Sequence, residues 1–148
     1  MIQGKWFAPG EDLSGAVLPV RHSVFGSGQD ALDAESWNTV VYRDGVPAAS
    51  GRIWWKDGAF WLGDLGVLPG FRGQRLGDLV LRLLLFKAQS HAAREVRLRC
   101  PETVEGFFSR LGFSEVSRDG LVEMLLPGDK IELDSCKSCK KQDCPNRK

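Results

Sequence analysis

The spacing of apolar residues along this chain predicts its helices and strands. Apolar residues at intervals of three and four positions, preceded by residues typical of helix starts, predict three helices, over residues 12–25, 76–93 and 104–111. Shorter apolar or alternating runs predict seven strands, over residues 2–7, 37–42, 48–55, 60–67, 95–99, 113–117 and 121–126. The order of these elements predicts an α/β domain built around a mixed sheet.

Two hairpin signals fix part of the predicted topology. Asp44-Gly45 and Asp57-Gly58 each separate two apolar runs, and glycine accepts the positive φ that a tight turn requires. The strands from residue 37 to residue 67 are therefore expected to form an antiparallel meander. Gly63 and Gly66 weaken its last strand, and glycine in a strand often marks a bulge or the close approach of a ligand.

Composition narrows the class of protein without identifying it. The chain has 148 residues, 43% of them apolar, and its 20 basic and 19 acidic residues give a net charge of +1. This balance gives no bulk electrostatic case for binding nucleic acid or a membrane surface. No charged leader precedes an apolar segment, so a cytoplasmic protein is expected. We expect one folded domain over residues 1–127 and a polar, cysteine-rich tail over residues 128–148.

The segment between the strand at 60–67 and the helix at 76–93 carries the main functional signal. It contains Gly70, Gly73 and Gly77 together with Arg72 and Arg75. A strand, a glycine-rich loop and a helix form an arrangement in which backbone N–H groups receive an anion, most often phosphate. The alternative is an ordinary strand-to-helix turn.

Three segments, in the right order, resemble the GNAT (Gcn5-related) N-acetyltransferases. Residues 67–77 are similar to the V-x-P-x-x-R-G-x-G-x-G/A motif for acetyl-CoA, and residues 107–113 (FFSRLGF) are similar to the F-Y-x-x-L-G-F segment. Residues 21–25 (RHSVF) resemble the end of the first helix in many members. The resemblance implies a mixed, mostly antiparallel sheet, with a V-shaped splay between its central strands and helices flanking it.

The resemblance also implies an activity and a set of binding residues. The activity is transfer of an acetyl group from acetyl-CoA, as co-substrate, to a primary amine by direct attack in a ternary complex. A backbone N–H near Val67 would stabilise the oxyanion. The residues implied in cofactor binding are Leu65, Gly66, Val67, Arg72, Gly73, Gln74, Arg75, Leu76, Gly77, Asp78, Phe107 and Phe108.

Two positions depart from the family pattern. Arg75 stands where the middle glycine is expected, so its side chain must stay outside the phosphate site, with contact to a phosphate from the flank as one option. Phe108 stands where a tyrosine usually protonates the leaving CoA thiolate. Another group or water supplies that proton, or the thiolate leaves unassisted, which its pKa near ~8.5 permits.

Several polar residues are candidates for roles toward the acceptor amine. Asp64 is the leading catalytic candidate because it directly precedes the implied pantetheine-binding residues; the alternatives are exposure to solvent or pairing with an arginine. His22 is a weaker candidate base and is expected on the surface. Arg52 and Glu123 are expected to be solvated strand residues, with recognition of the acceptor's charge as the alternative.

Four tryptophans gather on the predicted meander, at positions 37, 54, 55 and 61. Packing in the core or on the sheet surface is expected. The alternatives are the wall of an acceptor pocket and a contact in a homodimer.

The tail carries a cluster of thiols, Cys136, Cys139 and Cys144. Their spacing suits zinc or another thiophilic metal, but a closed tetrahedral site needs a fourth ligand, for which Cys100, His22 and His91 are candidates. A redox-active tail and an extension without function are the alternatives.

A second hypothesis for the whole chain is a non-catalytic acyl-CoA-binding or sensing module with this cysteine tail. The first hypothesis requires a small-molecule or peptide amine as partner.

Overall fold

A seven-stranded sheet forms the centre of the computed structural model, which describes residues 1–131. The strands are β1 (Ile2–Phe7), β2 (Trp37–Arg43), β3 (Val46–Lys56), β4 (Ala59–Val67), β5 (Glu95–Cys100), β6 (Ser114–Asp119) and β7 (Leu121–Pro127). They lie in the order β1-β2-β3-β4-β5-β7-β6, and only β4 and β5 run parallel. The predicted fold class, a mixed and mostly antiparallel sheet flanked by helices, is confirmed.

Both predicted hairpins are present, and each turn uses left-handed backbone at both of its central residues. Asp44 and Gly45 have φ of 52° and 83°, and Asp57 and Gly58 have φ of 52° and 79°. Positive φ at both positions matches the twist of the flanking strands, which explains why an Asp-Gly pair predicts the hairpin.

The three helices are α1 (Val17–Phe25), α2 (Leu76–Ser90) and α3 (Glu105–Ser109). The prediction that the first helix begins at residue 12 is wrong by five residues. The carboxylate of Asp12 accepts hydrogen bonds from the backbone N–H and the hydroxyl of Ser14, at 3.0 and 2.7 Å. Such local side-chain bonds compete with helical ones and hold this segment in a turn.

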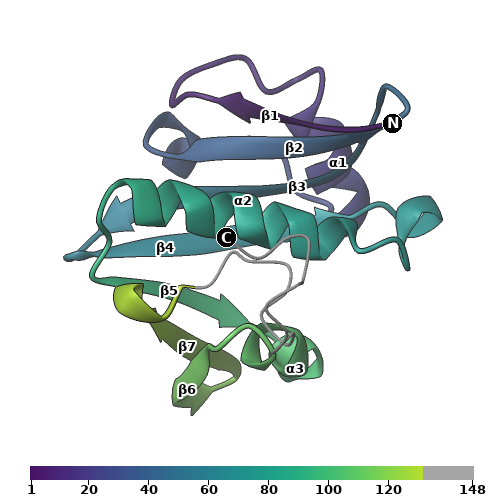
Figure 1. Cartoon of the computed structure of the whole chain (residues 1–148). Coiled ribbons are helices and arrows are strands. Elements are labelled where there is room, and N and C mark those ends of the chain that lie inside the picture. The colour runs from purple at the N-terminus through teal and green to yellow at the C-terminus, as the bar shows by residue number, and fades with distance from the viewer. Residues whose placement is uncertain (132–148) are drawn as a thin grey trace, which may run out of the picture.

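Helices α1 and α2 cover opposite faces of the sheet (Figure 1). A Cβ added to Gly51 of β3 would come within 2.9 Å of Val80 of α2. On the other face, a Cβ added to Gly66 of β4 would come within 2.9 Å of Val24 of α1. Small residues at these two points let both helices approach the sheet closely.

The main core lies between α2 and the sheet. The α2 residues Val80, Leu81, Leu84 and Leu85 are each at most 1% exposed. Complete burial of such a side chain contributes about 1.5–3 kcal/mol. Ile131, beyond the predicted domain boundary, is also buried in this core, and the division into a domain and a tail stays a prediction. None of the helices in the described part is both long and apolar enough to cross a bilayer.

The two central strands separate partway along their length, as the splay prediction requires. β4 and β5 pair only from Phe60–Leu62 to Val96–Leu98. After Leu62, β4 keeps its pairing with β3 but contains a bulge, since two of its residues face Gly51 alone. Among the described residues, the edge of β4 that faces β5 therefore has no strand partner toward its end.

A buried network of charges joins α1, the loop before β2, and β3. Arg21 of α1 is 1% exposed and donates to both oxygens of Asp33, at 2.7 and 3.1 Å, and to Asn38 at 2.8 Å. Arg52 of β3 is 8% exposed and donates to Asp33 at 3.2 Å and to both oxygens of Asp30, at 2.7 and 3.0 Å. The network fixes α1 and this loop against the centre of the sheet.

Asp33 remains ionised at the centre of this network. Burial raises the pKa of Asp33, but hydrogen bonds from Arg21 and from the backbone N–H of Asp30 outweigh it. Together with the charges of Arg21 and Arg52, they lower the pKa from 3.8 to about 2. The two arginines thus keep a carboxylate that has almost no contact with solvent in its charged form.

Replacing Asp33 by asparagine is expected to lower the free energy of unfolding by about 3–5 kcal/mol, because it leaves Arg21 buried without its counter-charge. Asp30→Asn is the matched control. The Asp30 side chain is 52% exposed, so its loss is expected to cost about 1 kcal/mol or less. Chemical denaturation of both variants measures the difference, and equal costs would contradict a central role for Asp33.

Candidate functional site

The glycine-rich loop leads from the end of β4 into α2 without a capping side chain. A 3-10 turn, Pro69–Phe71, follows β4, and the Arg72 side chain then donates from Nε to the carbonyl of Val67 at 3.1 Å. The helix begins at Leu76 after Arg75, and among the described residues no side chain accepts a hydrogen bond from its first turn. The first N–H groups of α2 are therefore open to an anion.

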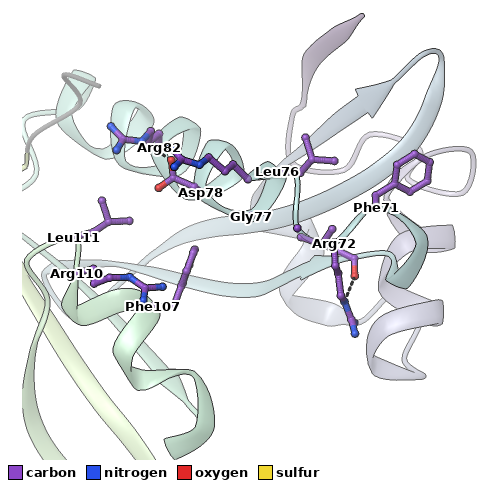
Figure 2. A pocket seen from close by; sticks show the side chains of 12 residues that line it. Phe71, Arg72, Leu76, Gly77, Asp78, Arg82, Phe107, Arg110 and Leu111 are labelled. Carbon is purple, nitrogen blue, oxygen red and sulfur yellow. Dashed lines mark hydrogen bonds and ion pairs between the residues drawn. The ribbon is translucent and has the colours of Figure 1, made fainter. Parts of the chain in front are cut away.

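A cavity of about 500 Å³ lies over this helix start. Figure 2 shows residues from the loop and the first turns of α2 facing Phe107 and Arg110 of the α3 region across it. Four arginines line it, at positions 72, 75, 82 and 110, against a single carboxylate, Asp78. Asp78 is paired with Arg82 at 2.9 Å. This excess of positive charge suits a ligand with several negative charges.

A second cavity of about 550 Å³ occupies the splay between β4 and β5. Its walls are largely apolar and include Val24 and Phe25 from α1, Leu98 from β5, and Val104 next to α3. The two cavities share four lining residues, Val67, Arg72, Gly77 and Phe107. A cationic chamber and an apolar channel therefore adjoin at the point where β4 passes into the loop.

Nearly all of the residues implied in cofactor binding line one of these cavities; the exception is Gln74. Arg75 adopts left-handed backbone, with φ of 64°. A glycine would adopt this conformation without strain, whereas an arginine pays about 1–2 kcal/mol for it. Arg75 lines the cationic cavity, and contact of its side chain with a phosphate from the flank stays a prediction.

Phe108 is 8% exposed and packs edge-on against Phe107 and Phe113, with ring centroids 5.1 and 6.0 Å apart. Phe108 also lines the splay cavity, so the same side chain is part of the core and of the cavity wall. Cys100 lines the same cavity and is 3% exposed. Burial raises the pKa of Cys100, so its thiol stays protonated at neutral pH.

Asp64 lies in the bulge of β4, in left-handed backbone with φ of 51°, and lines the splay cavity. One of its oxygens is 2.8 Å from Nε of Arg52 and 3.7 Å from Nε of Arg21. Pairing with an arginine, one of the two alternatives to catalysis, is therefore present. The Asp64 side chain is still 26% exposed, so it can pair with Arg52 and also contact a ligand in the cavity.

The expectation that Arg52 is a solvated strand residue is wrong. Its side chain is 8% exposed, because Asp30, Asp33 and Asp64 together neutralise it beneath the surface. Glu123 is 17% exposed and accepts hydrogen bonds from Arg97 and Arg99, at 2.8 and 3.2 Å. The alternation of apolar and polar residues along a strand predicts which face of the sheet a side chain is on. It does not predict the charged residues, such as Asp30 and Asp33, that a loop places against that face.

Other sequence candidates lie away from the two cavities. His22 is exposed and lines neither of them. The tryptophans also lie outside the cavity walls: Trp37 packs against Trp6 and Lys87, Trp54 lies under Arg52, and Trp61 lies under Arg99. Surface and core packing accounts for these contacts.

The predicted metal ligands Cys136, Cys139 and Cys144 lie outside the described residues. Within residues 1–131, no three side chains of histidine, cysteine, aspartate or glutamate gather where a metal ion could bind.

Several residues that line the cavities had no role assigned from the sequence. They include Val24, Phe25, Arg82, Arg99, Pro101, Val104, Arg110 and Leu111, whereas Cys100 was a candidate only as a metal ligand. Val24 and Phe25 belong to the RHSVF segment, which was the one available signal for them. Arg110 and Leu111 belong to the FFSRLGF segment, and Arg82 lies on α2 at the first cavity. The remaining residues come from the end of β5 and the segment before α3, which the order of the strands brings to the splay.

Comparison with known proteins agrees with this geometry. The family model described as the acetyltransferase (GNAT) domain matches residues 35–115, more than half of the chain. The fold is similar to that of an acyl-CoA N-acyltransferase from Pseudomonas aeruginosa, with TM-score 0.74, 21% identity and coverage of 84% of this chain and 99% of that one. No curated protein sequence matches the chain.

Two further structures have the same fold. The ribosomal-protein-S18-alanine N-acetyltransferase from Escherichia coli has TM-score 0.72, 17% identity and coverage of 86% of this chain and 94% of that one. The PaiA N-acetyltransferase from Thermoplasma acidophilum, in complex with coenzyme A, has TM-score 0.70, 11% identity and coverage of 86% and 99%.

The chain therefore belongs to the GNAT family of acetyltransferases. Membership implies acyl-CoA-dependent N-acetyltransferase activity, with acetyl-CoA as co-substrate.

The close contact between β4 and α1 beside the splay is testable. Gly66→Ala would bring Cβ within 2.9 Å of the Val24 side chain and 3.0 Å of the Phe25 ring, so these side chains or α1 itself must shift. We expect the free energy of unfolding to fall by about 1–3 kcal/mol. Gly70→Ala, where a Cβ meets no atom within 4 Å, is the control and should stay within about 0.5 kcal/mol of the wild type. Similar values for the two variants would show that the contact at Gly66 is not tight.

Proposed function

We propose that this protein transfers the acetyl group of acetyl-CoA to a primary amine by direct attack within a ternary complex. The observation that carries the proposal is the junction of the two cavities at Val67, Arg72, Gly77 and Phe107. A cationic chamber that opens into an apolar channel matches a ligand with phosphates at one end and an acyl thioester at the other.

The pyrophosphate of CoA would bind at the start of α2. Backbone N–H groups of Gly73–Gly77 and the positive end of the helix favour an anion there. The arginines that line the chamber add charge-assisted hydrogen bonds. Arg72 is already oriented by its bond to the Val67 carbonyl, which reduces the entropy it would lose on binding a phosphate.

The pantetheine arm would lie along the end of β4. Beyond Leu62 this strand has no partner on the β5 side, and buried backbone groups without partners are costly. An extended arm with two amide groups would satisfy the backbone groups of Leu65, Gly66 and Val67 in the manner of an added strand.

The acyl transfer itself needs few protein groups. The neutral amine attacks the thioester carbonyl, and a backbone N–H near Val67 stabilises the resulting oxyanion. Asp64 orients the amine or takes its proton. The CoA thiolate leaves with the electron pair of the broken C–S bond, and because Phe108 carries no proton, water protonates the thiolate afterwards.

The acceptor is a small-molecule or peptide amine. The similar enzyme from Escherichia coli is named for alanine of ribosomal protein S18, but that enzyme is only 17% identical to this chain. A metal at the cysteine tail and a homodimer remain predictions without a supporting observation in the described residues.

The activity is tested by incubating the full chain with acetyl-CoA and a panel of amines, amino acids and peptides, and by following free thiol. We expect thiol release that depends on the acceptor, and initial rates that give intersecting double-reciprocal plots, as a ternary complex requires. Parallel plots would indicate a covalent intermediate. CoA binding without turnover on any acceptor would favour the non-catalytic sensing module.

Gly77→Val is expected to weaken the binding of CoA at least about tenfold, or 1.4 kcal/mol. A Cβ at this position would lie 3.4 Å from Val67 and 3.8 Å from Leu65 and Phe107, so the larger side chain fills the junction of the cavities. Calorimetric titration with CoA measures the loss. Gly70→Val is the matched control, because Gly70 has no atom within 4 Å of an added Cβ and lines neither cavity. Equal binding by the two variants would contradict the proposed path of CoA.

A further inference from the structure

Arg99 is the polar group of the splay cavity that the proposed transfer does not use. It follows Leu98, the last residue of β5 that pairs with β4, and it lines the cavity. Its guanidinium lies over the ring of Trp61, 4.9 Å from the centroid, and its Nε donates to Glu123 at 3.2 Å. The guanidinium is thus held on one face by an aromatic ring and on one edge by a carboxylate.

The other edge of this guanidinium is open. Within residues 1–131, neither terminal nitrogen of Arg99 has a hydrogen-bond partner, and the side chain is 56% exposed. The two terminal nitrogens of a guanidinium match the two oxygens of a carboxylate. Arg97, on the same face of β5, differs from Arg99 because Glu95 and Glu123 engage it and it lines neither cavity.

Apart from Arg72, at the junction with the first cavity, the charged residues of the splay cavity lie in two places. Asp64 lies on β4, two residues beyond Leu62, and Arg99 lies on β5, one residue beyond Leu98, where the strands have just separated. A carboxylate and a guanidinium therefore line the same cavity from its two opposing strands. The rest of the cavity wall is largely apolar, with Phe25, Leu65 and Val104 among its residues.

We propose that the acceptor is an amino acid with an apolar side chain, whose carboxylate binds Arg99 while its amine lies toward Asp64. This inference rests on the proposed function, since it identifies the second substrate of the same reaction. The ammonium and carboxylate of a free amino acid complement the two charged walls, and its apolar side chain suits the remaining lining. Arg99 is then a specificity-determining residue.

The test compares acceptors that differ only in the carboxylate: leucine, phenylalanine and methionine, each against its carboxamide. For the wild type, kcat/KM is expected to be about tenfold higher for the acid, because the uncharged carboxamide cannot accept the bidentate, charge-assisted hydrogen bonds of the guanidinium. The amide has the less basic amine and so a larger neutral fraction. A preference for the acid cannot therefore arise from ionisation of the amine.

The variants assign the preference to one side chain. Arg99→Gln should lower the ratio of kcat/KM for acid over amide at least about tenfold. Arg99→Lys keeps the charge but loses the planar guanidinium. Its ratio of kcat/KM for acid over amide should lie between the ratios of the wild type and of Arg99→Gln. Arg97→Gln, the control on the same strand and face, should keep the ratio within about twofold. Thermal unfolding of each variant establishes that it is folded.

The possible results separate the two proposals. Turnover of acids and amides at similar rates by the wild type would overturn the inference and leave the proposed function standing. An equal fall of the ratio in the Arg97 and Arg99 variants would also overturn it. Absence of turnover with every amine, amino acid and peptide would overturn both proposals.

Discussion

The loss of pairing between β4 and β5 after Leu62 is the constraint on which the rest of this structure depends. A sheet that stayed closed would have no internal space, whereas one that opens at its centre exposes backbone groups that water or a ligand must satisfy. The bulge at Asp64 and the glycines on either side of it bend β4 away from β5 while its ladder with β3 continues. The opening is therefore a consequence of the backbone, and the cavity follows from it.

The charge network maintains this opening from the α1 side. Two buried arginines and Asp33 join α1 and the loop before β2 to the sheet, and the Nε atoms of both arginines lie near Asp64. A buried network of this kind adds little net stability compared with apolar packing, but it defines positions well. Here it fixes a carboxylate at the wall of the cavity in a backbone conformation that an aspartate alone would rarely hold.

Features that are local in sequence could be predicted, and features that depend on distant contacts could not. Both hairpins, the strand order up to β4 and the loop before α2 follow from turn chemistry and apolar spacing. The first helix was predicted too long because the bond between Asp12 and Ser14 is invisible to spacing. The buried state of Arg52 was missed for a related reason, since its partners Asp30 and Asp33 lie about twenty residues away.

The same division explains why the acyl donor is easier to identify than the acceptor. In the proposed complex, CoA would be held mainly by backbone groups of one continuous segment, from the end of β4 to the start of α2, and such a site leaves a motif in the sequence. The splay cavity, where we place the acceptor, is lined by residues from α1, β4, β5 and the α3 region, which the fold alone brings together. Recognition through the backbone tolerates side-chain change, whereas recognition through side chains changes with each substitution. Specificity for the amine therefore resides in the part of the site that a family motif does not describe.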